Sequence, residues 1–360
     1  MAADYSAYSD ANVKMPALGT DYMIGAHPLV LKALADSNGL RTPGYGTDSF
    51  CEDAASAIRR ACHCPEAEVR FFIGGTQTNA VVLSSLLAPY QGVVAVDSGH
   101  IAAHEAGAVE RGGHKVLTLP GKEGKIDPAA LKTFWASWEK DETREHMVMP
   151  GAVYLSQPTE IGTLYSLAEL KAIHDICRSS GMALYVDGAR LAYALACEEN
   201  DITLADLAAL CDAFYIGGTK CGALFGEALV LPRPGRIPRL FSIMKQSGAV
   251  LAKGRLLGIQ FKALFTDNLY FRIGREALEK ADRLRKGLQE AGYPLLSNSP
   301  TNQIMVPVSA PLYHRLIQEG YGGFWALKED GSFEIRFVTD FSTREEEIEE
   351  LLSLMNPKNA

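Results

Sequence analysis

Short apolar runs that alternate with helical patterns dominate the middle of this sequence, and they restrict the folds that it can adopt. Seven such runs, each bounded by turn residues, lie between Val69 and Pro232: VRFFI, VVAV, KVLTL, AVYLS, MALYV, AFYIG and EALVLP. An uninterrupted apolar run is typical of a strand buried on both faces, and an intervening helix is the usual crossover between parallel strands. The pattern therefore predicts an α/β fold with a mostly parallel seven-stranded sheet between helices.

The pattern changes after the segment PRPGRIP at residues 232–238. Helical patterns then continue to about Ala291, and two strand-like runs, QIMVPV at 303–308 and FEIRFV at 333–338, flank a helix at 311–319. These elements predict a smaller C-terminal α+β domain. We therefore expect an N-terminal arm over residues 1–25, a large α/β domain over 26–259 and a small domain over 260–360.

Composition argues against several classes of protein. The 360 residues include 35 Lys and Arg against 43 Asp and Glu, a net charge of −8, whereas nucleic acids and anionic membranes require clustered positive charge. The seven cysteines are an odd number in a long chain, which argues against a disulfide framework. The first residues lack the basic and apolar regions of a signal peptide, and no apolar run approaches the roughly 18 residues that span a membrane. We therefore expect a cytoplasmic protein.

Ligands of an open parallel sheet bind beyond the carboxyl ends of its strands, so the residues that follow each apolar run are candidates for a site. Four of these positions carry glycine pairs or chemically active side chains. They are residues 74–77 (GGTQ) after VRFFI, 98–100 (SGH) after VVAVD, 187–190 (DGAR) after MALYV and 217–220 (GGTK) after AFYI.

The segment GGTQTN begins at Gly74, where a predicted strand turns into a helix. Backbone N–H groups at a helix N-terminus attract anions, so the glycines and the Thr76 hydroxyl could hold a phosphate; a plain glycine turn with a threonine cap is the alternative. No G-x-G-x-x-G sequence follows a strand, and GGTKC is not a P-loop because glycine must directly precede the lysine of that motif. These observations argue against a nicotinamide site or a nucleotide-hydrolysing site.

Asp187 and Lys220 each admit several roles. A carboxylate directly after a buried strand is costly to desolvate unless it has a partner, so Asp187 could pair with Arg190, cap the next helix or hold a protonated ring nitrogen of a cofactor. Burial would make the Lys220 amine nucleophilic, although exposed loop lysines are common. A phosphate cradle, an aspartate after one strand and a lysine 33 residues later, after the next strand, is the order of parts that holds pyridoxal 5′-phosphate as a Schiff base.

These motifs resemble those of the low-specificity threonine aldolases, which belong to the β-eliminating lyase group of fold-type-I pyridoxal-phosphate enzymes. The resemblance covers most of the chain, and its most specific part is VDGAR followed by a downstream lysine. It implies the transferase-like fold of the fold-type-I enzymes and pyridoxal 5′-phosphate as cofactor, and we expect no metal. The segments that carry it are AHP, YGTD, GGTQTN, HIAAHEAGA, TEIGTLYSLAEL, VDGARLAYA, GGTKCG and IRFVTDFS.

By that resemblance, Lys220 forms the Schiff base with the cofactor and Asp187 pairs with the pyridinium nitrogen. His100 stacks on the cofactor ring and joins Lys220 as a catalytic residue, with His104 on the same helix as its rival. Residues that hold the phosphate are Gly75, Thr76 and Gln77, together with Lys253 from a neighbouring subunit.

The same resemblance implies that Arg190 and Arg336 grip the α-carboxylate of an amino acid by paired hydrogen bonds. Arg190 is also expected at the cofactor. Both arginines have a structural alternative, which is an ion pair with Asp187 for Arg190 and a solvated strand position for Arg336. Thr20 best matches the serine that assists carboxylate binding in the family, and Tyr45 of YGTD either lines the site or forms a packed turn.

The sequence departs from the family where the β-hydroxyl group of the substrate is handled. Many threonine aldolases carry a histidine after the strand that corresponds to AVYLS, and this chain reads QPTE at residues 157–160 instead. Glu160 or a water molecule is then the candidate base, and a structural role for Glu160 is equally open. The departure bears on the substrate more than on the cofactor.

The leading hypothesis is a threonine aldolase that cleaves L-threonine or L-allo-threonine to glycine and acetaldehyde. A pyridoxal-phosphate-dependent β-eliminating lyase that acts on another L-amino acid is the runner-up. A metabolite-binding protein without turnover is a third alternative, and the presence of both Asp187 and Lys220 argues against it. Because family members are dimers or dimers of dimers with sites at the subunit interface, we expect a homodimer or a homotetramer.

Overall fold

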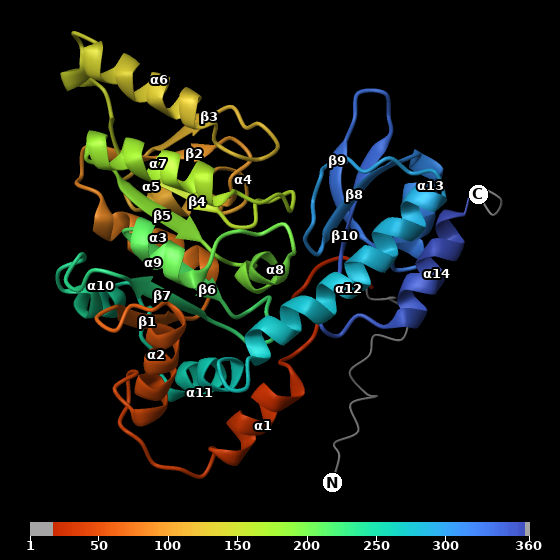
Figure 1. Cartoon of the computed structure of the whole chain (residues 1–360), viewed down its shortest axis with the longest axis horizontal. Coiled ribbons are helices and arrows are strands. Elements are labelled where there is room, and N and C mark those ends of the chain that lie inside the picture. Colours follow the sequence, from red (N-terminus) through yellow and green to blue (C-terminus); the bar gives the residue numbers. More distant parts are fainter. Residues whose placement is uncertain (1–16, 357–360) are drawn as a thin grey trace.

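The computed structural model describes residues 17–356, and the statements below concern that part of the chain. The strands of its larger sheet are β1 (Glu68–Phe72), β2 (Gln91–Val96), β3 (Val116–Leu119), β4 (Met149–Ser156), β5 (Ala183–Asp187), β6 (Ala213–Gly217) and β7 (Glu227–Leu231). They lie in the order β1-β7-β6-β5-β4-β2-β3 (Figure 1). Neighbouring strands are parallel except at β7, which is antiparallel to both β1 and β6. The predicted mostly parallel seven-stranded sheet is therefore confirmed.

Helices lie between most of these strands, and their ends follow sequence signals. Asp48 caps one helix through the N–H of Cys51, and Ser166 and Glu169 form a capping box at another. The helices of this region are α1 (Pro28–Asp36), α2 (Ser49–Ala61), α3 (Gly75–Leu86), α4 (His100–Ala103), α5 (Ala108–Arg111), α6 (Pro128–Lys140), α7 (Leu167–Ser180), α8 (Leu191–Ala196), α9 (Leu204–Leu210), α10 (Leu240–Gln246) and α11 (Arg255–Leu264), with a 3-10 turn at Arg144–His146.

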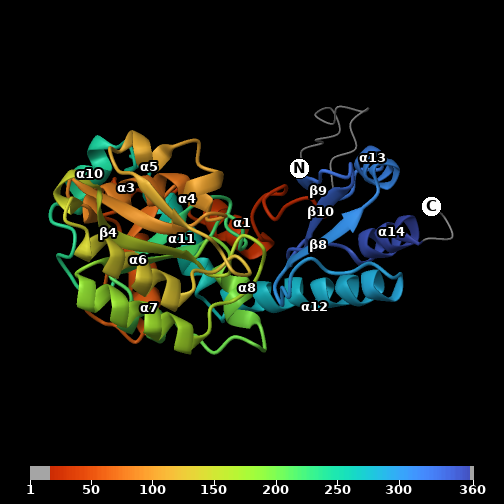
Figure 2. The same ribbon diagram turned by 90° about the horizontal axis from the view of Figure 1, so that it is seen from above.

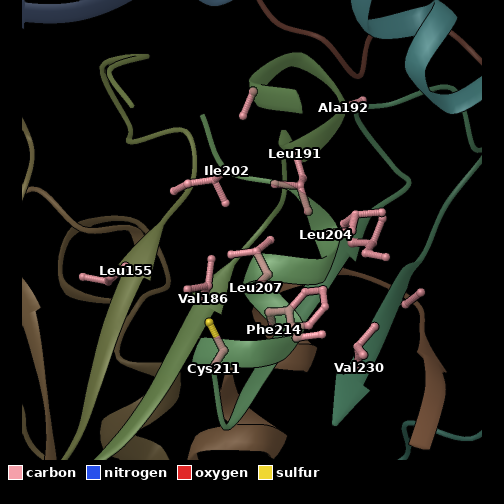
Figure 3. Close-up of a cluster of buried hydrophobic side chains, with 14 of the residues drawn as sticks. Leu155, Val186, Leu191, Ala192, Ile202, Leu204, Leu207, Cys211, Phe214 and Val230 are labelled. Atoms are coloured by element: carbon pink, nitrogen blue, oxygen red, sulfur yellow. The ribbon is translucent and has the colours of Figure 1, made fainter. Parts of the chain in front are cut away.

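Alternate residues of the strands point into two separate cores. In β5, Leu184 and Val186 belong to a cluster that includes side chains of α2, α7, α8 and α9, whereas Ala183 and Tyr185 belong to a cluster with α3, α5 and α10. Figure 3 shows part of the first cluster, where Leu207 of α9 lies near Val186 of β5. Because both faces of the sheet are covered, its strands read in the sequence as continuous apolar runs.

A three-stranded antiparallel sheet forms the C-terminal part of the chain. Its strands are β8 (Gln303–Val308), β9 (Gly323–Leu327) and β10 (Phe333–Val338) in the order β8-β10-β9, accompanied by helices α12 (Leu269–Glu290), α13 (Ala310–Gln318) and α14 (Glu345–Met355).

The long helix α12 connects the two parts of the molecule, as Figure 2 shows. Ile273 and Ala277 lie in the core of the larger sheet, and Ala281 and Leu284, further along the same helix, lie in the core of the smaller sheet. One helix of 22 residues therefore supplies apolar surface to both cores.

Most of the predicted C-terminal elements are present. β8 and β10 coincide with the predicted runs, and α13 is shifted by one residue from the predicted helix. The strand β9 was not predicted, because it begins inside the turn signal Gly322-Gly323 and lies at the edge of the sheet, where burial is incomplete. The domain boundary predicted at residues 259 and 260 falls inside α11, which packs on α2, and the division into domains stays a prediction.

The predicted N-terminal arm lies partly outside the described residues, which begin at Ala17. The N–H of Ala17 donates to the carbonyl of Gly320, and the N–H of Val338 donates to the carbonyl of Leu18, whose side chain is buried in the core of the small sheet. The chain then passes toward the larger sheet, where Asp21 is buried. This segment therefore contacts both parts of the molecule.

Candidate active site

Loops at the carboxyl ends of β4, β5 and β6 meet the N-termini of α3 and α4 around a cavity of about 270 Å³. A second cavity of about 360 Å³ adjoins it and extends toward the small sheet. Residues that line the first cavity include Gly75, Thr76, His100, Glu160, Asp187, Arg190, Tyr215, Lys220 and Glu227. The second shares His100, Glu160, Arg190 and Lys220 and adds His104, Trp325 and Arg336. The four segments that were predicted to follow strands and to form a site therefore meet at these cavities, as expected for a parallel sheet.

Asp187 is the last residue of β5 and is buried in the wall of the first cavity. Its Oδ2 accepts hydrogen bonds from the Tyr154 hydroxyl at 2.6 Å and from Nδ2 of Asn79 at 3.0 Å, and its Oδ1 accepts one from the Tyr215 hydroxyl. Burial raises the pKa of Asp187, but the charge of His100 and these hydrogen bonds outweigh burial and hold the pKa below its ordinary value. The carboxylate is therefore ionised and suited to a cation in the cavity.

His100 begins α4, and its ring borders both cavities with 28% of the side chain exposed. Its Nδ1 lies 2.8 Å from Oε1 of Glu105, and this buried oxygen also accepts a hydrogen bond from Asn79 at 2.8 Å. Burial lowers the pKa of His100, but the bond to Glu105 and the charges of Glu160 and Asp187 raise the pKa above its ordinary value. Because Asn79 donates to Glu105 and to Asp187, one amide group orients both carboxylates.

Arg190 does not pair with Asp187, which was one of the alternatives left open by the sequence. Its Nε and Nη2 donate to the two oxygens of Asp21 at 2.7 and 3.0 Å, and both side chains are buried. Nδ2 of Asn302 donates to the same carboxylate at 3.0 Å. Burial lowers the pKa of Arg190, but the charge of Asp21 outweighs burial and holds the pKa above its ordinary value. This ion pair leaves Nη1 of Arg190 for a ligand.

Arg336 of β10 borders the second cavity. Its Nη1 lies 3.4 Å from Oε1 of Gln303, and its guanidinium carbon lies 5.2 Å from the ring centre of Trp325. Burial and the charge of Arg190 lower the pKa of Arg336, and its buried Nε has no hydrogen-bond partner within residues 17–356. A partly buried guanidinium with an unused buried donor is suited to an anionic ligand such as a carboxylate. His104, the rival to His100, borders this cavity and not the first.

The N-terminus of α3 carries the residues predicted to bind phosphate. Gly75 and Thr76 border the first cavity, and α3 begins at Gly75. A Cβ atom at Gly75 would lie 3.0 Å from the hydroxyl of Tyr215, so a larger residue would press on a group that holds Asp187. Gln77 does not border the cavity, but its Oε1 is buried without a hydrogen-bond partner in the described part of the chain. Helix N–H groups beside a threonine hydroxyl are suited to a phosphate.

Besides Gln77, three predicted residues lie outside both cavities. Thr20 has a buried hydroxyl for which no partner is found among the described residues. Tyr45 and Lys253 lie on neighbouring loops, joined by a hydrogen bond from the N–H of Tyr45 to the carbonyl of Ala252, and Tyr45 borders a separate cavity of about 330 Å³. Within one chain, Tyr45 and Lys253 are therefore not brought to Lys220.

The segment QPTE at residues 157–160 replaces the histidine that many threonine aldolases carry after this strand. Gln157 is buried and uses both ends of its amide on the backbone of Tyr165, with Nε2 donating to the carbonyl and Oε1 accepting from the N–H. Glu160 borders both cavities and accepts a hydrogen bond from the hydroxyl of Ser156 at 3.1 Å. The acidic group of this segment that a ligand can meet is therefore Glu160.

Several residues of the site were missed by the sequence analysis. A signal for the tyrosines exists, because the neighbouring runs AVYLS, MALYV and AFYIG each contain one, and a buried hydroxyl needs a partner. Asn79 and Glu105 are polar residues within the motifs GGTQTN and HIAAHEAGA. No comparable signal marks Asp21. The missed residues are Asp21, Asn79, Glu105, Tyr154, Tyr185, Tyr215 and Glu227.

The chemistry of the first cavity fits pyridoxal 5′-phosphate. The ionised Asp187 suits a protonated ring nitrogen, Lys220 supplies an amine, and the N-terminus of α3 suits the phosphate. The partly exposed ring of His100 borders the same space. No group of three or more metal-binding side chains is found within residues 17–356.

Comparison with known proteins gives a consistent result. A family model described as beta-eliminating lyase matches residues 41–311. A low specificity L-threonine aldolase from Pseudomonas sp. (strain NCIMB 10558) is 29% identical over 337 residues, which cover 92% of this chain and 94% of that protein. The solved structure of a threonine aldolase from Leishmania major is 39% identical with a TM-score of 0.91, covering 96% of this chain and all of that chain. An aspartate aminotransferase from Thermus thermophilus, 17% identical with a TM-score of 0.71 over 96% of this chain and 91% of that chain, shares the fold.

The buried ion pair between Asp21 and Arg190 leads to a stability prediction. Asp21→Ala should lower the free energy of unfolding by about 3–5 kcal/mol, because it leaves the buried guanidinium of Arg190 without a counter-charge. The exposed pair of Lys32 and Asp36 provides the control, and Asp36→Ala should cost less than about 1 kcal/mol. Urea denaturation measures both, and equal losses in the two variants would show that burial of the Asp21 pair has no special effect.

Proposed function

This chain belongs to the β-eliminating lyase family, and on that basis we propose that it is a pyridoxal-phosphate-dependent threonine aldolase that cleaves L-threonine and L-allo-threonine to glycine and acetaldehyde. The observation that carries the proposal is one cavity that contains Lys220, the ionised Asp187 and the N-terminus of α3. The 39% identity to a threonine aldolase over nearly the whole chain supports this activity over others in the family.

The residues of the first cavity would hold the cofactor. Lys220 would hold the cofactor through its aldehyde group, and Asp187, whose own pKa is lowered, would keep the ring nitrogen protonated. Gly75 and Thr76 would hold the phosphate at the N-terminus of α3, and Gln77, whose Oε1 is buried, would support them from the first turn. When bound, pyridoxal 5′-phosphate supplies an electron sink for the pair of electrons released at Cα of the substrate.

Arg336 is the residue to which we assign the substrate α-carboxylate. Its Nε is buried without a partner among residues 17–356, and the ring of Trp325 lies beside its guanidinium group. Arg190 contributes its remaining nitrogen, because Asp21 occupies the other two. A carboxylate held here fixes the rotation of the substrate, and that orientation decides which bond at Cα is cleaved.

Glu160 is the group to which we assign removal of the β-hydroxyl proton. It borders both cavities, whereas Gln157 is held by the backbone of Tyr165 and cannot take the part of the family histidine. Loss of the hydroxyl proton turns the Cβ–O bond into a carbonyl as the Cα–Cβ bond breaks, and the aldehyde leaves. Cα must then receive a proton to give glycine.

Replacement of Lys220 tests the activity. Lys220→Ala should abolish acetaldehyde release from L-threonine and L-allo-threonine and remove the visible absorption of the bound cofactor, because the amine that binds it is lost. The control is the wild-type protein loaded with pyridoxal 5′-phosphate in the same assay. A wild-type protein that absorbs in the visible but releases no aldehyde would keep the cofactor and refute the aldolase, and β-elimination from other L-amino acids would then be assayed.

Two further variants separate binding from chemistry. Arg336→Gln should raise KM for L-threonine about 10- to 100-fold, because a charged hydrogen bond to the carboxylate is lost. Glu160→Gln should lower kcat at least about 100-fold with KM little changed, because the proton acceptor is lost. Glu169→Gln, which alters a carboxylate bonded to Lys125, is the matched control and should keep wild-type kinetics. Wild-type kcat in Glu160→Gln would assign the proton to water.

We further propose a homodimer or homotetramer whose second copy covers α1 and the loop that follows it. Leu29, Leu31, Leu40 and Tyr45 are each about half exposed there. A partner at this face would bring a second set of residues near the loops of Tyr45 and Lys253, which are remote from the cavities of their own chain. The predicted role of Lys253 in a neighbouring site depends on this arrangement.

Sedimentation tests the oligomer. The wild-type protein should sediment at least as a dimer, and Leu31→Glu should shift it to a monomer because a charge replaces an apolar contact. Ile317→Glu on α13 is the control. Ile317 is also an exposed aliphatic residue but lies beside the small sheet, so this variant should leave the oligomer intact. A monomeric wild type would refute the proposal.

We also propose a reducing compartment such as the cytoplasm. All seven cysteines are free of disulfides, and six of them are buried. Burial raises the pKa of the Cys62 and Cys177 thiols to about 12, so they stay protonated and unreactive. No helix within residues 17–356 is long and apolar enough to cross a membrane. Cell fractionation tests the compartment.

A further inference from the structure

Glu227, the first residue of β7, lies directly beneath the loop that carries Lys220. Its Oε2 accepts a hydrogen bond from the N–H of Gly218 at 3.0 Å, and its Oε1 accepts one from the hydroxyl of Thr219 at 2.8 Å. Both donors immediately precede Lys220 in the sequence, and Glu227 and Lys220 line the same cavity. No assigned step of the reaction uses this carboxyl group.

The carboxyl group of Glu227 is part of a closed set of hydrogen bonds. The Thr219 hydroxyl that donates to Glu227 also accepts from the N–H of Gly226 at 2.9 Å, and the N–H groups of Gly218 and Thr219 reach the carbonyl of Gly226 at 3.0 and 3.1 Å. Hydrogen bonds therefore join the two ends of the loop at residues 218–226 to each other and to the Glu227 carboxyl group. A change at this side chain would alter the anchorage of Lys220.

Glu227 is also electrostatically unusual. It forms no ion pair with any residue in the described part of the chain, and it is buried. Burial raises its pKa to about 8, against the opposing effects of the bonds from Thr219 and Gly218 and of the charge on Lys220, while the charge of Asp187 raises the pKa further. The other titratable groups that feel its charge have raised pKa values and are neutral near pH 8: Tyr185, Tyr215, Cys221 and Tyr270.

We propose that Glu227 is a positioning residue for Lys220, whose carboxyl group anchors the lysine loop and whose charge is coupled to the charge on the lysine nitrogen. The proposal rests on the proposed role of Lys220 in binding the cofactor. An ionised Glu227 favours a positive charge on that nitrogen, and a protonated Glu227 favours the uncharged form. The charge of Asp187 also favours a positive charge on the lysine nitrogen. Because the pKa of Asp187 is lowered, its charge does not change near pH 8.

Two variants separate charge from anchorage. Glu227→Gln removes the charge but keeps an acceptor for the N–H of Gly218. Glu227→Asp keeps the charge but is too short to reach both donors. Glu169→Gln, a partly buried carboxylate bonded to Lys125, is the control.

The first measurement is the pH titration of the visible absorption of the cofactor bound to Lys220 in the loaded protein. In Glu227→Gln the midpoint should fall by about one pH unit at pH values above 8, where the wild-type Glu227 is ionised, because the anion that favours the protonated nitrogen is gone. In Glu227→Asp and Glu169→Gln it should stay close to the wild-type value. A midpoint in Glu227→Gln equal to that of the wild type would overturn the coupling.

The second measurement is amide hydrogen exchange over residues 218–226 of the loaded protein. Glu227→Asp should speed exchange about tenfold, because one of the two anchoring bonds is lost, whereas Glu227→Gln should change it much less. Unchanged exchange in Glu227→Asp would overturn the anchoring role, and it remains informative if Glu227→Gln does not fold.

These readouts distinguish two kinds of failure. If the wild-type protein shows no visible absorption, or if Lys220→Ala keeps it, the cofactor assignment fails and the inference falls with it. If the absorption depends on Lys220 but its midpoint and the loop exchange are unaffected by Glu227, the aldolase proposal stands and the role of Glu227 is refuted.

Discussion

The rest of the site depends on the need to keep one buried carboxylate ionised. Asp187 lies at the end of a central strand, where burial alone would favour its neutral form. Hydroxyl groups of Tyr154 and Tyr215, from the strands on either side, and the amide of Asn79, from α3, all donate to it. The pairing of β4 with β5 and of β5 with β6 sets the register that brings these donors to one point. The charge of Asp187 therefore depends on the register of the sheet, because a shift in register would remove the donors and protonate Asp187.

A second buried charge connects the two parts of the molecule. Asp21 accepts from Arg190, directly before α8, and from Asn302, directly before β8. The substrate-side cavity lies at this junction, with Lys220 on one side and Arg336 on the other. Because an isolated buried charge is costly, this three-way contact favours one relative placement of the two cores, in addition to the shared helix α12. The distance between the group that would bind the cofactor and the group that would bind the carboxylate is thus fixed by the fold rather than by a mobile loop.

The sequence was sufficient to predict the features that repeat along the chain. Continuous apolar runs revealed the seven strands, and the topology of a parallel sheet placed Lys220, Asp187 and Gly75 at one edge. The sequence was insufficient to predict contacts that join distant segments of the chain without a local pattern. Asp21 was missed because nothing in its neighbourhood specifies Arg190, 169 residues away, as its partner. Thr20 was chosen in its place, although it borders neither cavity. Glu227 was read as part of an apolar run, since a single carboxylate at a strand start is usually solvated; the loop above it, which buries it, is a tertiary feature.

The departure at Gln157 shows how the same cavity can keep its chemistry when one side chain changes. In a retro-aldol cleavage, a proton acceptor must reach the β-hydroxyl, whereas β-elimination requires an acceptor at Cα and a donor to the leaving group. Gln157 is bonded to the backbone of Tyr165, and Glu160, three residues later, borders both cavities. Glu160 and Arg336 border the same cavity, so the proposed base and the proposed carboxylate-binding group can meet one substrate. Lys220 borders both cavities. The base proposed above, Glu160, is distinct from the lysine, and such an arrangement would suit carbon–carbon cleavage better than elimination, so a chain without the histidine is compatible with an aldolase.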